Sequence, residues 1–253
     1  MSDNLLLAVL PPAERERLAP FFTTVELKQG DRMIEPGQPI RYLWFPIDAI
    51  TSTIQVLSDG TMIESGLMGL EGVVGLQIWL RQKTTDQLTF AQVPGRAKRI
   101  DSAVFRREVM DHGSPLNDLM GAYIHAFLVL TGQTAACNRL HPVDQRLCRW
   151  LRMVYNRVPQ KRTFPMRQEY LADMLGVHRP SVSVAAAVIQ KAGWISYSRG
   201  EMQILDPDGL SSGACECLEI MERQFDRMFQ QPWLPLARQE MSAERQLADG
   251  RRR

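Results

Sequence analysis

The sequence predicts an α+β protein in three parts: an N-terminal β-roll, a long dimerisation helix and a C-terminal winged helix-turn-helix. Three observations support this prediction. Short apolar runs alternate with glycine turns over residues 23–100, which is typical of an antiparallel roll or sandwich. A long apolar helix is expected to begin after Ser114. Residues 167–195 have the apolar spacing of two short helices joined at a glycine.

The N-terminal part begins with a helical lead-in over residues 5–22, and short strands follow. Ser58-Asp-Gly-Thr61 is a strong hairpin turn between two of these strands, Ile50–Leu57 and Met62–Leu67. In the first strand, alternation predicts that Ile50, Ser52, Ile54 and Val56 share one face. Pro94-Gly95 predicts a second hairpin, formed by Thr89–Val93 and Ala97–Ile100.

Glycines recur at every third position, at 66, 69, 72 and 75. A dinucleotide-binding fingerprint requires G-x-G-x-x-G between a strand and a helix, and this spacing does not match it. We therefore interpret the stretch as a loop that wraps round the opening of the roll.

The long central helix is expected from Ser114-Pro115 to about Leu140, after a short helix Ser102–Asp111 capped by Asp101. Its apolar residues form two adjacent stripes, and a helix so broadly apolar is buried on two sides. We expect the first stripe to pack on the roll and the second to form the seam of a homodimer. Packing of both stripes within one subunit is the alternative. The first stripe is Leu116, Met120, Tyr123, Phe127 and Leu130; the second is Ile124, Leu128, Thr131 and Ala135.

A hinge at about 140–143, at His141-Pro142, leads to a further helix, Val143–Val158, and then to the helix-turn-helix. Gly176 ends its first helix and Pro180 lies at the start of the second. An apolar face of the second helix is predicted to contact the first. The outward side chains at the start of the second helix suit entry into a DNA major groove, and an ordinary helical hairpin is the alternative. The apolar face is Val182, Ala185, Ala186, Ile189 and Ala192; the outward residues are His178, Arg179, Ser181 and Ser183.

Residues 194–205 predict a two-stranded wing with a turn at Arg199-Gly200. Asp206-Pro-Asp-Gly209 is then expected to be a loop, before a helix near Ala214–Phe229. The polar tail from Pro232 ends in Arg251-Arg-Arg253, three arginines that are usually a solvated terminus.

Positive charge is concentrated in the second half of the chain. Between residues 145 and 205 there are ten Lys or Arg against three acids, although the whole chain carries only +2. This distribution favours a phosphate-facing module joined to a module with another role. We accordingly divide the chain into a β-roll sensor domain (1–113), a dimerisation helix and hinge (114–141), a winged helix-turn-helix DNA-binding domain (142–210) and a C-terminal helix with a polar tail (211–253).

The four cysteines are Cys137, Cys148, Cys215 and Cys217. None forms a C-x-x-C pair, and no histidine lies at a metal-ligand spacing from any of them. Cys215-Glu-Cys217 is too close for a relaxed disulfide or a recognised zinc half-site. We therefore predict reduced thiols, no metal and no cofactor. With no secretory signal pattern and no run of about 18 apolar residues, we expect a cytoplasmic protein without a membrane partner. No catalytic constellation is visible, so an enzyme is not expected.

This order of parts resembles the Crp/Fnr family of bacterial transcription regulators over residues of about 10–210. The resemblance is strongest in the helix-turn-helix and is supported by short motifs of the roll. It implies a roll like the cyclic-nucleotide-binding jelly roll, a homodimer, a palindromic operator in double-stranded DNA, and RNA polymerase as a further partner. The matching motifs are Lys28-Gln-Gly-Asp31, Glu35-Pro-Gly37, Gly72-Val-Val-Gly75, Val93-Pro-Gly95 and residues 168–179.

The resemblance also marks a candidate effector pocket at Gly75, Leu76, Thr85, Asp86 and Thr131. Members that bind cyclic nucleotides hold the phosphate with a Gly-Glu and an Arg-Ser pair, and these positions are Gly75-Leu76 and Thr85-Asp86 here. Because the arginine is missing and an acid stands nearby, we expect no cyclic AMP binding. The alternative is a sensor for a nucleotide or another small ligand.

Two further departures from the family's patterns concern iron–sulfur and haem cofactors. No cysteine precedes Cys137, which excludes the N-terminal iron–sulfur cluster of Fnr-type members. His112 is the first histidine and lies beyond the roll, so a haem ligand there is not expected.

For the DNA contacts, Arg179 is the candidate for reading guanine O6 and N7. His178, Ser181 and Ser183 are expected at neighbouring bases or phosphates, and Arg167 and Gln168 at phosphates. Because Pro180 and Val184 replace the family's frequent Glu and Arg, the half-site is expected to differ from that of the catabolite activator.

Overall fold

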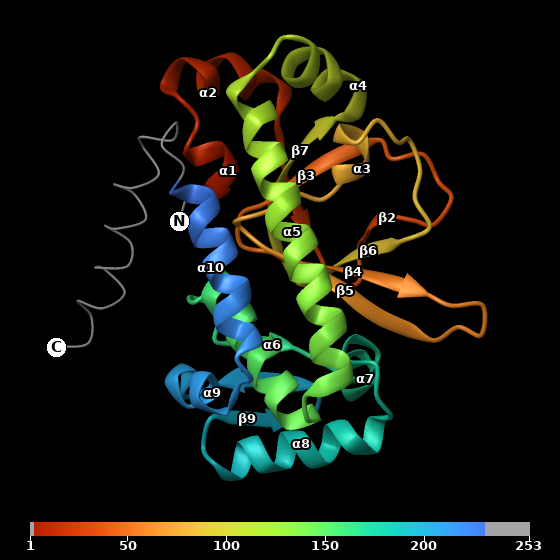
Figure 1. Ribbon diagram of the computed structural model, residues 1–253, viewed down its shortest axis with the longest axis vertical. Helices are drawn as coiled ribbons and strands as arrows, with labels where there is room; N and C mark the ends of the chain where they lie inside the picture. Colours follow the sequence, from red (N-terminus) through yellow and green to blue (C-terminus); the bar gives the residue numbers. More distant parts are fainter. Residues whose placement is uncertain (1–2, 231–253) are drawn as a thin grey trace, which may run out of the picture.

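The structure is a computed structural model that describes residues 3–230 (Figure 1). The polar tail from Pro232 and the three final arginines lie outside the described residues. Over the described part, the chain forms a β-roll, a long helix and a winged helix-turn-helix in that order, which confirms the predicted α+β architecture.

The N-terminal half is a roll of two antiparallel sheets behind a short helical lead-in. Side chains of both sheets, such as Leu43, Phe45, Ile50 and Ile100, are fully buried between them. The lead-in is α1 (Leu5–Ala8), α2 (Pro12–Leu18) and the 3₁₀ turn η1 (Ala19–Phe21). One sheet has the order β1 (Thr23–Leu27), β7 (Gly95–Asp101), β3 (Tyr42–Pro46). The other has the order β2 (Arg32–Ile34), β6 (Leu88–Val93), β4 (Ile50–Val56), β5 (Met62–Met68).

One predicted hairpin is confirmed and the other is wrong. β4 and β5 pair directly through the Ser58–Thr61 turn. In contrast, β6 pairs with β2 and β4, whereas β7 pairs with β1 and β3, so the Pro94-Gly95 step carries the chain from one sheet to the other. Proline donates no ladder hydrogen bond, and a Cβ on Gly95 would lie 2.4 Å from the Asp48 carbonyl oxygen. These two residues mark a corner between sheets.

The predicted alternation of β4 does not hold, because Ile50–Ile54 are all buried. A bulge interrupts the strand between Thr53 and Ile54, and the C-terminal half of the protein covers its outer face.

The glycines that recur at every third position lie where helices approach the roll. A Cβ on Gly66, which lies in β5, would be 2.6 Å from the Phe127 ring, and one on Gly69 would be 2.9 Å from Arg157. The glycines therefore admit two helices close to the roll, instead of forming a single loop.

The long central helix is α5 (Pro115–Leu140). The Ser114 hydroxyl caps it by accepting a hydrogen bond from Leu116 N, as predicted. In the chain, α5 comes after α3 (Leu76–Trp79), α4 (Ser102–Phe105) and the π-helical segment η2 (Arg106–Asp111). Asp101 caps α4 as expected.

Two neighbours cover α5. Its first apolar stripe packs on the roll, and α10 (Cys217–Phe229) runs antiparallel beside it (Figure 1). Tyr123 of α5 and Phe225 of α10 lie with their ring centroids 6.3 Å apart. Within residues 3–230, α5 is the one helix long and apolar enough to cross a membrane, a test that the core helix of a soluble protein also passes.

The C-terminal half contains the predicted helix-turn-helix and wing with three differences. A short strand, β8, adds to the wing; it is too brief for a periodic signal. Asp206 caps a helix, α9, where a loop was expected, because its side chain accepts hydrogen bonds from Asp208 N and Gly209 N. Ala192 is exposed and does not belong to the buried face. The elements are α6 (Val143–Arg157), β8 (Thr163–Pro165), α7 (Gln168–Leu175), α8 (Arg179–Lys191), β9 (Ile195–Ser198), β10 (Glu201–Ile204) and α9 (Pro207–Gly213), with strand order β8-β10-β9.

Buried polar contacts join the two halves. Arg157 of α6 forms an ion pair with Glu71 after β5, Nε to Oε1 2.7 Å, and each side chain is 8% exposed. Lys161 Nζ donates to the carbonyls of Asp48 and Pro94, both at 2.7 Å. α7 also packs directly on β5. Roll and helix-turn-helix therefore share one continuous core.

Candidate DNA-binding surface and a thiol–imidazole cluster

The second helix of the helix-turn-helix presents one exposed face. α8 lies at the end of the molecule farthest from the β-roll (Figure 1). Gly176 ends α7 in the left-handed region at φ 58°, and Val182, Ala185, Ala186 and Ile189 bury the inner face of α8, as predicted. On the outer face, Val184 and Val188 are 66% and 55% exposed. His178, Arg179 and Ser181 are also exposed.

Arg179 is positioned by two side chains of α7. Its Nη1 forms an ion pair with Glu169 Oε1 at 2.8 Å, and its Nε donates to Gln168 Oε1 at 3.3 Å. Ser183 is half-buried and donates to the same Gln168 oxygen at 2.9 Å. The Gln168 amide thus joins the two helices and holds the arginine at the start of α8.

Apart from the half-buried Arg152, the basic residues between 145 and 205 divide into two groups. Arg146, Arg149 and Arg157 are buried, and Lys161 is bound to carbonyls of the roll. These four residues therefore do not face a phosphate surface. The count of cations predicted that they would, because a count from the sequence does not separate buried from exposed arginines. The exposed cations are Arg162, Arg167, Arg179, Lys191 and Arg199.

The start of α7 and the tip of the wing lie close together. Met166 N donates to Gly200 O at 2.7 Å, and Tyr197 Oη donates to Met166 O at 3.0 Å. Arg167, the residue that begins α7, is therefore next to the β9–β10 turn that carries Arg199, whose φ is 52°. Two exposed guanidinium groups flank this junction.

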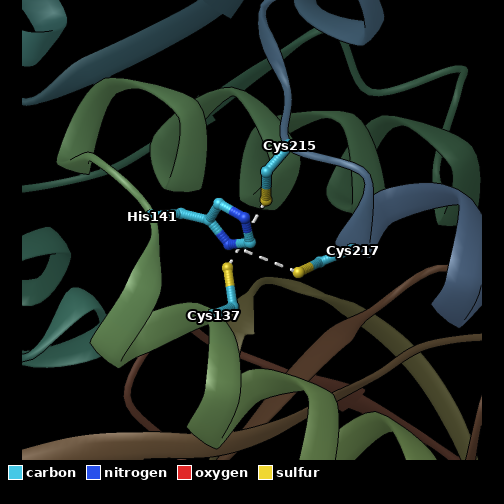
Figure 2. A group of neighbouring side chains, drawn as sticks. All are labelled: Cys137, His141, Cys215 and Cys217. Atoms are coloured by element: carbon cyan, nitrogen blue, oxygen red, sulfur yellow. Dashed lines mark hydrogen bonds between the residues drawn. The ribbon is translucent and has the colours of Figure 1, made fainter.

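A second group of side chains converges where α5 meets α10. Cys137 and His141 lie one helical turn apart at the end of α5, and Cys215 and Cys217 flank the start of α10 (Figure 2). One donor atom from each of the four lies within 4.8 Å of the other three. The Sγ atoms of Cys137 and Cys215 are 3.5 Å apart, as are Cys217 Sγ and His141 Nδ1. Three sulfurs and an imidazole nitrogen are a ligand set that holds a metal ion.

Neighbouring polar groups orient this cluster. The other ring nitrogen of His141, Nε2, is 3.1 Å from Glu216 Oε1, and Gln133 Nε2 donates to Cys217 Sγ at 3.1 Å. A hydrogen bond from the Cys215 thiol lowers the pKa of Cys137 to about 5. Burial raises the pKa of Cys217.

These four residues could not be grouped from Cys215 and Cys217 alone, because their partners, Cys137 and His141, precede the whole helix-turn-helix. The expectation that no histidine lies at a ligand spacing from a cysteine is wrong. The four-residue step from Cys137 to His141 places both on one face of a helix. Cys148, the remaining cysteine, is buried outside the cluster, and burial raises its pKa to about 12.

Comparisons with known proteins agree with this geometry. Residues 145–212 match the Crp-like helix-turn-helix domain. The chain has the Crp/Fnr fold. A search of curated protein sequences found no match.

Several solved structures share the fold at low identity. FixK2 from Bradyrhizobium japonicum has a TM-score of 0.63 at 13% identity, over 77% of this chain and 98% of that one. CLP from Xanthomonas campestris, described as a c-di-GMP responsive global regulator, has a TM-score of 0.59 at 16% identity, over 77% and 99%. A CRP-family transcriptional regulator from Thermus thermophilus has a TM-score of 0.60 at 16% identity, over 75% and 96%.

Within the Crp/Fnr fold, the effector candidates are only partly brought together. Gln77 of α3 donates to Gln87 Oε1 at 3.1 Å, which joins the Gly75–Leu76 segment to the loop that carries Thr85 and Asp86. Leu76 is buried, and Asp86 is exposed. α3 meets α5 at Asn117, through Trp79 Nε1 at 2.9 Å. Thr131 lies fourteen residues further along α5, about 21 Å away, and its hydroxyl donates to Phe127 O.

The second stripe of α5 remains open on one side. Leu128 is 64% exposed, Ala135 is exposed, and Ile124 and Thr131 are half-buried. Neither the roll nor α10 covers this stripe fully. The first stripe is buried within the subunit except for Phe127, which is half-buried.

Proposed function

We propose that the protein is a homodimeric, sequence-specific DNA-binding transcription regulator of the Crp/Fnr type that acts in the cytoplasm. The observation that carries the proposal is the exposed first turn of α8 in a Crp-like helix-turn-helix domain. There, Arg179 presents a planar fork that suits guanine O6 and N7. His178 and Ser181 are exposed beside it.

The surrounding cations suit the DNA backbone. Arg167 and Arg199 flank the junction of α7 and the wing, where phosphate contacts fix the register of a protein on DNA. Gln168 supports the contact indirectly, because it binds Arg179 and Ser183. We assign Ser183 to positioning for the same reason.

The open stripe of α5 supports a homodimer. An exposed leucine at the middle of a long apolar helix is buried economically by a twofold-related copy. The resulting seam contains Ile124, Leu128, Thr131 and Ala135 and predicts a palindromic operator, because operator symmetry follows protein symmetry. RNA polymerase is a further proposed partner.

Selection from random duplexes tests this function. The purified protein should enrich a palindromic sequence whose half-sites each contain a G·C pair read by Arg179. It should bind the selected duplex at least about 10³-fold more tightly than a scrambled one, which is the lower range for specific regulators. Equal affinity for selected and scrambled duplexes would contradict the proposal.

A second candidate is a regulator whose DNA binding is switched by a small ligand in the roll. Arg81 and Lys83 favour it, because they are exposed cations beside the Thr85–Asp86 loop. Equilibrium binding of a panel of cyclic mono- and dinucleotides distinguishes the candidates: a ligand that binds and raises DNA affinity supports the second.

A further inference from the structure

We propose that Cys137, His141, Cys215 and Cys217 bind one zinc ion in a tetrahedral site that fastens both ends of the DNA-binding domain to α5. The proposal concerns the chain itself and does not depend on which DNA the protein reads.

The donor separations fit a single ion. A tetrahedral zinc ion with bonds of about 2.3 Å to sulfur and about 2.1 Å to nitrogen holds its donors about 3.6–3.8 Å apart. Cys137 Sγ and Cys215 Sγ are 3.5 Å apart, and Cys217 Sγ and His141 Nδ1 are also 3.5 Å apart. A cluster of several iron atoms requires wider separations, and thiolates with imidazole are ligands that suit zinc.

The histidine has the environment of a metal ligand. A metal-bound imidazole commonly donates its other N–H to a carboxylate, which fixes the tautomer and the ring orientation. Here Nδ1 faces the sulfurs and Nε2 lies 3.1 Å from Glu216 Oε1. Glu216 stands between the two C-terminal cysteines, so the segment that supplies two ligands also orients a third. The Gln133 amide donates a hydrogen bond to Cys217 Sγ, and a metal-bound thiolate accepts this hydrogen bond as well as a thiol does.

Charge supplies an independent argument. Arg146 and Arg149 of α6 are each 4% exposed, and an arginine remains protonated in a protein. Over residues 3–230, neither forms an ion pair with a carboxylate, although the buried Glu64 carboxyl interacts with Arg149 over a longer distance. Arg149 donates to the sulfurs of Met153 and Met221, and Arg146 donates to Asn138 and to the Leu175 carbonyl. Three thiolates and a dication leave one net negative charge, which offsets the buried positive charge of two arginines that form no ion pair.

The position of the site indicates its role. Cys137 and His141 lie just before the chain enters the Crp-like domain at residue 145, and Cys215 and Cys217 lie just after it leaves at 212. A metal bound there joins the entry and the exit of the domain. It also fixes the start of α10, which packs along α5.

Metal analysis of the full chain, purified with reductant and without chelator, tests the proposal. We expect one zinc per chain. After removal of the metal, Co²⁺ alone should produce the visible absorption of a tetrahedral ion with a thiolate charge-transfer band, and Zn²⁺ alone should displace it. Cys217→Ser and His141→Gln should lose this signal, whereas Cys148→Ser, a buried cysteine outside the cluster, should keep it. Glu216→Gln should weaken metal affinity about 10- to 100-fold.

Alkylation of the wild-type protein covers the case in which a variant fails to fold. Zinc should protect Cys137, Cys215 and Cys217 from alkylation, and chelator should remove that protection. The proposal is overturned if wild-type protein gives no cobalt spectrum, if Cys217→Ser binds cobalt as wild type does, or if chelator leaves alkylation unchanged. A Cys137–Cys215 disulfide in protein purified under reductant also overturns it.

Discussion

Trp150 of α6 donates its indole N–H to Glu64 Oε1 of β5 across 3.1 Å. The same carboxyl group accepts a hydrogen bond from Ser52 Oγ at 2.6 Å. Glu64 is buried, and burial raises the pKa of its carboxyl group above the ordinary value of 4.5. This titratable group therefore lies in the contact between the roll and the DNA-binding half.

Glu64→Gln should change how stability depends on pH. Because the folded-state pKa is raised, the native protein binds this proton more tightly than the unfolded chain does. The resulting stabilisation is present below pH 4.5 and is lost as the pH rises through the folded-state pKa. The free energy of unfolding of wild type should therefore fall relative to Glu64→Gln as the pH rises from 4.5 through the folded-state pKa. Urea denaturation across this range measures it. Glu26→Gln, at an exposed position on β1, serves as control, and a difference independent of pH would contradict the assignment.

Arg179→Ala should lose about 1–3 kcal/mol on the selected duplex and relax discrimination at one base pair of each half-site. Arg179→Lys should not restore it, because an ammonium lacks the planar fork. Binding to scrambled DNA should change little. Titrations on both duplexes measure these effects. If Arg179→Ala weakens both duplexes equally, Arg179 holds phosphate and base reading passes to His178 or Ser181.

Arg167→Ala is the matched comparison, since it removes an exposed guanidinium at the start of α7 instead of α8. It should weaken selected and scrambled duplexes alike and reduce the slope of log affinity against log salt by about one unit. A salt series on both duplexes separates this behaviour from that of Arg179→Ala. A loss confined to the selected duplex would assign base reading to Arg167.

Leu128→Arg should separate the subunits. The substitution places an unpaired charge on each side of the proposed seam, at a cost of several kcal/mol. Ultracentrifugation should then show monomers. Leu57→Arg replaces another exposed leucine, at 56%, between β4 and the Ser58–Thr61 turn of the roll, and should stay dimeric. If Leu128→Arg also remains dimeric, the seam lies on another surface.

Cyclic AMP should not bind the roll at physiological concentrations, because Leu76, Thr85 and Asp86 offer no cation for its phosphate. Calorimetry with cyclic AMP measures this directly, and a micromolar dissociation constant would contradict it. If side chains of the protein itself fill the roll, the purified protein should also bind its selected duplex without an added effector.

Local signals in the sequence were sufficient for the helix-turn-helix and for the long helix. Gly176, Pro180 and the caps at Asp101 and Ser114 each act within a few residues, so a short window contains all the information. The Pro94-Gly95 corner was misread as a hairpin, because the choice between turning back and changing sheets depends on strands far away in the chain.

The buried arginines and the thiol–imidazole cluster depend on tertiary contacts. Arg157 looks like a DNA-facing cation until Glu71, from the other half of the chain, lies against it. Cys137 and Cys215 are separated by the entire helix-turn-helix, and no fixed spacing relates them. Only the packing of α10 along α5 brings them together.

The Glu71–Arg157 ion pair sets a threshold for allosteric control. A rotation of the DNA-binding half away from the roll would separate these two buried charges, and breaking such a pair costs about 3–5 kcal/mol. A ligand shifts a conformational equilibrium only by the difference between its affinities for the two states. Any small molecule that drives such a rotation must therefore bind the rotated form about 10²- to 10⁴-fold more tightly than this one.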